Sequence, residues 1–253
     1  MKKLSSFLVV LFLMLASFAA GLEYPRGDVN YDGQVSISDV SCLIDYLLNG
    51  TWPEEPVTPP DNHEWVDLGL PSGTLWATCN VGASNPEEYG DYFAWGETEP
   101  KEDYSWTTYK WCNGTSDSMT KYCTSISGTV DGKSELEPED DAAYVNWGPE
   151  WRMPTYDQIK ELINKCTWTW TTVNGVNGRM VTGPNGNTMF MPVPGVRIHE
   201  GFTDIGWGYY WSLEVYEHNA NMSNNLVFHS SAVMRGSSNR FVGNSVRAVR
   251  AGQ

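Results

Sequence analysis

One stretch near the start of the sequence has the spacing of a calcium-binding loop. Calcium is a hard cation, and loops of this type present oxygen ligands at positions 1, 3, 5, 7, 9 and 12, with a glycine at position 6 for the sharp turn. In GDVNYDGQVSISD, residues 27–39, Gly33 stands at position 6. The predicted Ca²⁺ ligands, with Gln34 acting through its backbone carbonyl and Ser36 through water, are Asp28, Asn30, Asp32, Gln34, Ser36 and Asp39. The alternative is an aspartate-rich turn that binds no metal.

The residues after this loop have the spacing of an amphipathic helix. Apolar side chains recur every three or four residues after Asp39, and Gly50 provides a stop. This apolar stripe consists of Val40, Leu43, Ile44, Leu47 and Leu48. A unit of this size cannot bury such a stripe by itself, so the helix is expected to dock on a second surface.

The stretch GDVNYDGQVSISDVSCLIDYLL resembles one repeat of a dockerin. Dockerin repeats have a calcium loop followed by one helix, and they use aspartate at position 12, where this chain has Asp39. The resemblance implies calcium binding. Dockerins carry two repeats, which together form the surface that binds a cohesin, and this chain carries one. The helix is therefore expected to dock on the large domain, with another copy or a separate, cohesin-like partner as alternatives.

A second candidate site is the aromatic run IGWGYYWS, Ile205–Ser212. Successive side chains of a strand point to opposite faces. Tyr210 is predicted to lie in the core. Trp207 and Tyr209 are candidates for an aromatic platform that binds a sugar ring, and the alternative is that some of these partners of Tyr210 also lie in the core.

The sequence offers little that is typical of an enzyme. It has no Gly-x-Ser-x-Gly motif, and its acidic residues fall in runs, such as 135–141, that are usual in solvated loops. A glycosidase needs two carboxylates at a defined separation, which a sequence cannot show. Metal-ligand spacing is absent from His63, His199, His218 and His229. We expect no enzyme activity, with a polysaccharide hydrolase as the alternative.

Composition and organisation indicate an exported protein of several parts. Residues 1–21 resemble a signal peptide, with Lys2 and Lys3 before a short apolar run, and no later stretch is long enough for a transmembrane span in the mature chain. The next parts are the calcium module at 22–50, a proline-rich linker at 51–63 and a large domain at 64–253. A net charge of −15 without a basic stripe argues against nucleic acid as a partner.

The large domain is expected to be α+β. Short apolar or alternating runs predict strands at 66–70, 74–81, 92–97, 188–193, 208–216, 225–234 and 245–251. A capped amphipathic helix is predicted at Pro154–Cys166, and a shorter one within 138–147. Turns are predicted at 71–73, 113–114, 174–175, 177–178 and 184–186. In an exported chain the four cysteines of this region allow three pairings, of which Cys112 with Cys123 closes the smallest loop.

Two stretches of the large domain, NWGPEWRMPTYDQIKELI and the region from GYYWS to SVRAVR, resemble the Fibrobacter succinogenes major paralogous domain. WVDLGLPSGTLWATCNVGA and YGDYFAWGETEPK resemble its Bacteroidetes branch. The resemblance implies a C-type-lectin-like fold in a secreted or cell-surface protein. The expected function is non-enzymatic binding of a glycan or protein ligand, and the alternatives are a component of a polysaccharide-degrading system and a purely structural surface protein.

Overall fold

The structure is a computed structural model that describes residues 29, 35, 37–49, 63–124 and 131–252. The chain divides into two compact units, Met1–Pro60 and Asp61–Gln253. The expected signal peptide and the linker up to residue 62 lie outside the described residues. No helix in the described part of the chain is long and apolar enough to cross a bilayer.

The described part of the first unit is mainly helix α2, Ile37–Asn49. It begins three residues before Val40, the expected start, so that Asp39 lies in its first turn, where an acidic side chain suits the helix dipole. The apolar stripe lies on this helix. Ile44, Leu47 and Leu48 are exposed, and Leu43 is half-buried.

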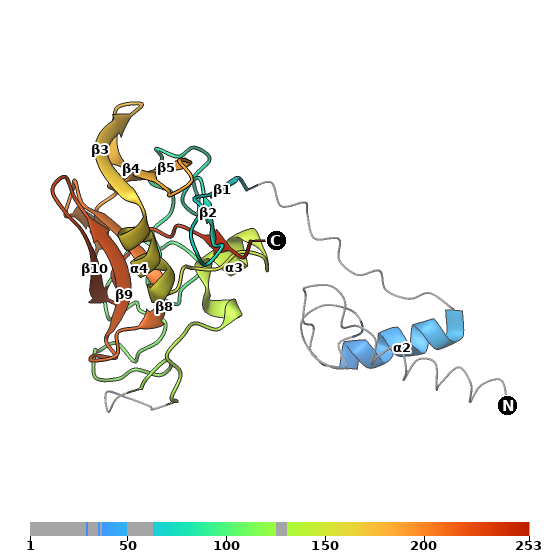
Figure 1. Cartoon of the computed structure of the whole chain (residues 1–253). Helices are drawn as coiled ribbons and strands as arrows, with labels where there is room; N and C mark the ends of the chain where they lie inside the picture. The colour runs from blue at the N-terminus through green and yellow to red at the C-terminus, as the bar shows by residue number, and fades with distance from the viewer. Residues whose placement is uncertain (1–28, 30–34, 36, 50–62, 125–130, 253) are drawn as a thin grey trace. The chain divides into compact units, whose positions relative to one another are not determined.

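The second unit is α+β, as expected, and is built from small antiparallel sheets (Figure 1). In one sheet the first and last strands flank β2, in the order β1 (Trp65–Asp67), β2 (Leu75–Ala77) and β11 (Val249–Arg250). The second has the order β10 (Val233–Asn239), β9 (Met222–Phe228) and β8 (Gly208–Val215). The third has the order β3 (Thr167–Val173), β4 (Val176–Thr182) and β5 (Thr188–Pro192), and β6 (Val196–Ile198) pairs with β7 (Gly201–Thr203).

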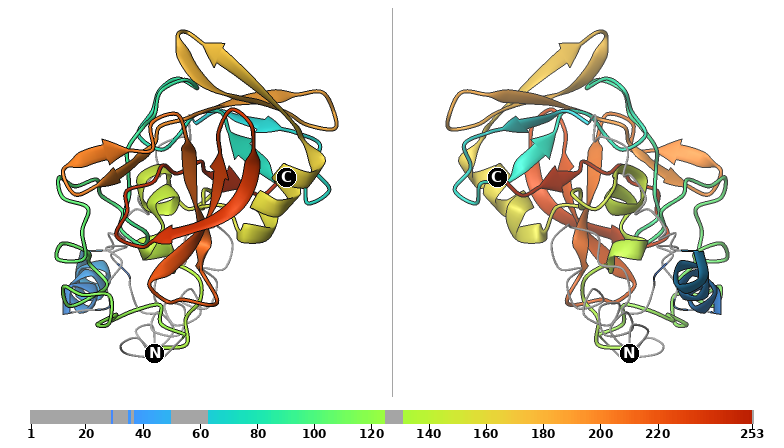
Figure 2. Two further views of the ribbon diagram at one scale, coloured as in Figure 1. Left: turned by 90° about the vertical axis from the view of Figure 1, so that its left-hand side faces the viewer. Right: turned by 90° about the vertical axis from the view of Figure 1, so that its right-hand side faces the viewer.

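Helix α4, Tyr156–Lys165, forms because its ends and its faces are specified locally. Thr155 accepts from the backbone N–H of Gln158, whose side chain accepts from the backbone N–H of Thr155, and this confirms the predicted capping box. The buried face of the helix packs against β8, β9 and β10 (Figures 1 and 2). The shorter predicted helix is a 3₁₀ turn η1 (Pro138–Asp140) followed by α3 (Ala142–Trp147).

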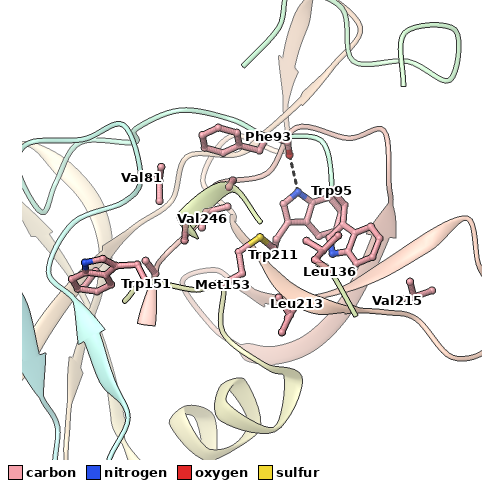
Figure 3. Packing of buried hydrophobic residues seen from close by; sticks show 14 of the residues in the cluster. Val81, Phe93, Trp95, Leu136, Trp151, Met153, Trp211, Leu213, Val215 and Val246 are labelled. Carbon is pink, nitrogen blue, oxygen red and sulfur yellow. Dashed lines mark hydrogen bonds between the residues drawn. The ribbon is translucent and has the colours of Figure 1, made fainter. Parts of the chain in front are cut away.

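Two large apolar clusters fill the two sides of the β8–β9–β10 sheet. Helix α4 contributes Ile159 and Leu162 to one of them, which also holds Tyr210. The other holds Trp95 and Trp211, whose indole nitrogen donates to the Phe93 carbonyl at 2.7 Å (Figure 3). Alternation along β8 thus directs successive aromatic rings into different clusters.

Several predicted elements differ from the structure. The predicted strand at 225–234 is a hairpin, with β9 and β10 joined across residues 229–232. Residues 92–97 form only an isolated bridge at Phe93. The predicted turn at 177–178 is wrong, because both residues lie in β4. No disulfide is formed among the five cysteines, all of which are described, so Cys112 and Cys123 are not joined.

Candidate aromatic binding site

The candidate platform lies where the chain enters β8. The rings of Trp207 and Tyr209 are 6.2 Å apart between centroids, and their planes differ by 20°. Both side chains are half-buried, whereas Tyr210 is 1% exposed. The core position of Tyr210 agrees with the prediction, and the binding role of Trp207 and Tyr209 stays a prediction.

A tight turn before β8 sets the direction of this pair. Asp204 has φ 53° and Gly206 has φ 91°, and the Trp207 amide donates to the Asp204 carbonyl at 3.0 Å. The Trp207 carbonyl accepts from the Gly195 amide at 2.8 Å, which ties the turn to the start of β6. Left-handed backbone is costly for residues other than glycine, so the turn is a specified feature of this loop.

A histidine from the neighbouring hairpin completes the aromatic group. The ring of His229 lies 4.1 Å from that of Trp207, at an angle of 37°. Its Nδ1 lies 3.2 Å from Ser231 Oγ and accepts weakly from the Ser231 amide at 3.4 Å. When Nδ1 accepts a hydrogen bond, Nε2 carries the proton of the neutral ring and is its donor.

A buried arginine binds the main-chain carbonyl of His229. Arg179 Nε and Nη2 donate to the His229 carbonyl at 3.0 and 2.7 Å, and Nη1 donates to the Trp168 carbonyl at 2.8 Å. Burial lowers the pKa of Arg179 below its ordinary value, because the charged form loses water. Arg179 is 7% exposed and its donors are directed at main-chain carbonyls, so it positions the hairpin instead of facing a ligand.

A carboxylate stands at the other side of the platform. The Tyr209 hydroxyl donates to Asp204 Oδ2 at 3.2 Å. Burial, followed by the charge of Asp204, raises the pKa of Tyr209 to about 12. The phenol therefore stays protonated at neutral pH and remains a donor. The exposed Asp204 keeps lone pairs that can accept from a ligand.

This arrangement suits a ligand with one apolar face and hydroxyl groups at its rim. Half-exposed aromatic rings provide an apolar surface with little conformational entropy to lose. Asp204 accepts hydrogen bonds, and the His229 ring can donate one. The predicted pair Trp207 and Tyr209 is brought together, while Asp204, His229 and Arg179 were missed as site residues.

The predicted calcium site is described only at Asp39. This residue is 2% exposed, and its Oδ1 accepts from the Val29 amide at 2.8 Å, so the twelfth position folds back to the second. Such closure fits a calcium loop, in which the last carboxylate turns toward the first ligands. Among the described residues no three acidic, histidine or cysteine side chains gather as a metal site. The other expected ligands lie outside the described residues: Asp28, Asn30, Asp32, Gln34 and Ser36.

Part of the acidic run at 135–141 is structural, contrary to the expectation of a solvated loop. Asp141 caps α3 and binds Arg152 Nε at 2.9 Å. Asp140 Oδ2 accepts from Lys121 and from the Tyr122 hydroxyl at 2.7 and 2.6 Å. These two carboxylates are buried with partners from the protein itself.

Glu214 is a further carboxylate whose pKa is shifted by its environment. Its Oε1 and Oε2 accept from the amide of Tyr156, the first residue of α4, at 3.0 and 2.8 Å. Burial is the main cause that raises the pKa of Glu214 above its ordinary value. Its carboxylate caps a helix, which is a structural role.

No family model, no curated protein and no solved structure matches this chain. The functional argument therefore rests on the sequence and on the geometry of the site.

Proposed function

We propose that the large domain is a non-enzymatic carbohydrate-binding module, in which a sugar ring packs on Trp207 and Tyr209. The observation that carries this proposal is the pair of nearly parallel, half-exposed rings between a carboxylate and a histidine. The aliphatic face of a pyranose matches such rings, and its equatorial hydroxyls reach polar groups at the rim.

Charge selects the kind of sugar. Asp204 is an acceptor when ionised, and the nearby guanidinium of Arg179 is occupied by the carbonyls of His229 and Trp168. A uronic acid or a sulfated sugar would therefore meet the Asp204 carboxylate, and Arg179 would not be available to balance the added negative charge, in a chain of net charge −15. The proposed ligand is a neutral glycan.

The fold and setting are part of the same proposal. Small antiparallel sheets, helix α4 and long connections of irregular structure support a C-type-lectin-like fold for the large domain. The resemblances of the sequence support a location outside the cell or on its surface. In a polysaccharide-degrading system, the protein would be the component that binds the glycan, and other proteins would cleave it.

The small unit is proposed as a calcium-stabilised docking element. The closure of Asp39 onto Val29 supports a folded loop, and calcium would neutralise the repulsion among the loop carboxylates. A metal that binds only the folded loop stabilises it, and so orders helix α2 with its exposed apolar stripe. The stripe then docks on the large domain, or on a cohesin-like partner as the alternative.

A glycan array followed by titration calorimetry tests the carbohydrate proposal. Trp207→Ala and Tyr209→Ala should each weaken binding of the best neutral glycan at least about tenfold, because losing one ring contact costs more than about 1.4 kcal/mol. Tyr209→Phe keeps the ring and should have a smaller effect. The matched control is Tyr216→Ala, since Tyr216 is half-buried near the end of β8 and contacts His218 in place of Trp207.

Three outcomes would contradict the proposal. One is the absence of binding to every glycan on the array. Another is an equal loss of affinity in Tyr216→Ala, which would mean that binding does not depend specifically on Trp207 and Tyr209. The third is turnover of a glycan that a single carboxylate substitution abolishes, which would favour the hydrolase alternative.

A further inference from the structure

One face of the β8–β9–β10 sheet continues the aromatic pair across the strands. Tyr209 of β8 pairs with Val227 of β9, and Val227 pairs with Met234 of β10. Directly paired residues of antiparallel strands have their side chains on the same face, so these three residues form a cross-strand row about 10 Å long. The row starts at the candidate platform and ends at the outer strand of the sheet (Figure 1).

The cross-strand row has apolar surface that a ligand can cover. Met234 is 40% exposed and Tyr209 is half-buried, while Val227 between them is 7% exposed. The next residue of β10 on this face, Gly236, has no side chain, and a Cβ there would approach a methyl carbon of Val227 to 2.7 Å. Glycine at this position therefore leaves the middle of the row uncrowded.

Burial sets the direction in which a longer ligand can extend from the platform. Along β8 the path is closed, because the next side chain on this face, Trp211, is 0% exposed and packs with Trp95 in the core. Across the strands the path is open at Met234. A chain of sugars that rests on Trp207 and Tyr209 would therefore run across β9 to β10.

The three strands, which are described throughout, place no charge on this face. Their only charged residues are Glu214 and Arg235. Glu214 accepts from the amide of Tyr156, and Arg235 lies over the Tyr156 ring, so both side chains are directed to the side of α4. An uncharged, mainly apolar row matches a neutral glycan.

We propose that the cross-strand row is an extension of the sugar site, and that the domain binds an extended neutral oligosaccharide in preference to a single sugar. This inference rests on the carbohydrate-binding function proposed above. The first sugar packs on Trp207 and Tyr209, and the next two cover Val227 and Met234, since one sugar unit is about as long as the spacing of neighbouring strands. A β-1,4-linked chain has the shape of a ribbon, which suits a row on a sheet, and the flexible thioether of Met234 adapts to the ring that it contacts.

Titration calorimetry of the full chain tests this, with β-1,4-linked gluco-, xylo- and manno-oligosaccharides of one to six units. In at least one series the Kd should fall at least about tenfold from one to three units and then level off. Met234→Ala should weaken binding of the trisaccharide about threefold to tenfold, because it removes apolar contact area, and should leave the disaccharide unaffected. Met234→Leu keeps most of that area and should restore binding. The matched control is Met180→Ala, a half-buried methionine of β4 in another sheet, which should leave every Kd unchanged.

The outcomes separate this inference from the proposed function. Binding that Trp207→Ala weakens but that does not strengthen with chain length would overturn the extension, and the aromatic pair would stand. A step between two and three units that survives Met234→Ala, or binding to none of the three series, would overturn the extension as well. Binding that withstands both Trp207→Ala and Tyr209→Ala would overturn the proposed function itself.

Discussion

Replacing Arg179 with lysine should destabilise the large domain and weaken ligand binding together. The guanidinium makes two hydrogen bonds to the His229 carbonyl and one to the Trp168 carbonyl. A lysine at this buried position keeps one of these bonds and loses the planar fork. Two hydrogen bonds to a charged group, at about 1.5 kcal/mol each, give an expected loss of about 3 kcal/mol.

Urea unfolding followed by tryptophan fluorescence measures this loss. With a slope of about 2 kcal/mol per molar, the midpoint should fall by about 1.5 M. Arg235→Lys is the control, because Arg235 is exposed and lies over the ring of Tyr156, and its change should stay within about 0.5 kcal/mol. The affinity for the best glycan should also fall in Arg179→Lys, since the backbone of His229 loses its support.

An unfolding midpoint of Arg179→Lys equal to that of the wild type would refute this reasoning. It would mean that the carbonyls of His229 and Trp168 find other donors at no cost. Normal stability with lost binding would instead place the guanidinium in direct contact with the ligand.

Three further predictions concern the calcium loop, its helix and a buried carboxylate. Titration calorimetry should show one calcium site that is lost in Asp28→Ala with Asp32→Ala, and an unchanged isotherm would exclude the loop as the site. Leu43→Asp with Leu47→Asp should lower the melting temperature of the large domain in calcium if α2 docks on it; an unchanged temperature with loss of a bound envelope protein would show outward docking. Burial raises the pKa of Glu214 from 4.5, so its contribution to stability is complete below that value and is lost as the pH rises through the raised pKa. Glu214→Gln should reduce this fall in urea stability between about pH 4 and pH 8, and an identical pH profile in the variant would contradict the assignment.

Local signals were enough to predict helix α4. Its cap, its acidic first turn and its apolar face are all set by residues within one short stretch, so the sequence specifies them directly. The hairpin turn at Asn174 and Gly175 was predicted for the same reason, since both residues adopt the positive φ that such a turn needs.

Glycine misled the prediction where its role depends on distant residues. Gly178 lies within β4, where a Cβ would approach the carbonyl oxygen of Met191 to 2.4 Å and the ring of Phe190 to 2.5 Å. The residue is glycine because a neighbouring strand is close, and this cannot be seen from the Asn177–Gly178 pair alone. Strands β3 and β4 were missed as a pair in consequence.

In the candidate site, too, some features are set by the local sequence and others by distant residues. Alternation along β8 indicated that Trp207 and Tyr209 share a face opposite to Tyr210. His229 reaches Trp207 only because β8 pairs with β9, and that register is set by the whole sheet. The residues next to His229 in the sequence therefore do not indicate its contact with Trp207.

The pairing of the first and last strands of the large domain has a consequence for how it folds. β2 lies between β1 and β11, and Arg247 donates to the Ala77 carbonyl, 170 residues earlier in the chain. The sheet can close only after β11 has left the ribosome, so the fold of the domain depends on residues near both of its ends. Contacts of such large sequence separation place folding in the slow range, about milliseconds to seconds or longer. The chain therefore passes through a period in which its tryptophan-rich clusters are exposed to solvent, and in this period it is open to association with other unfolded chains.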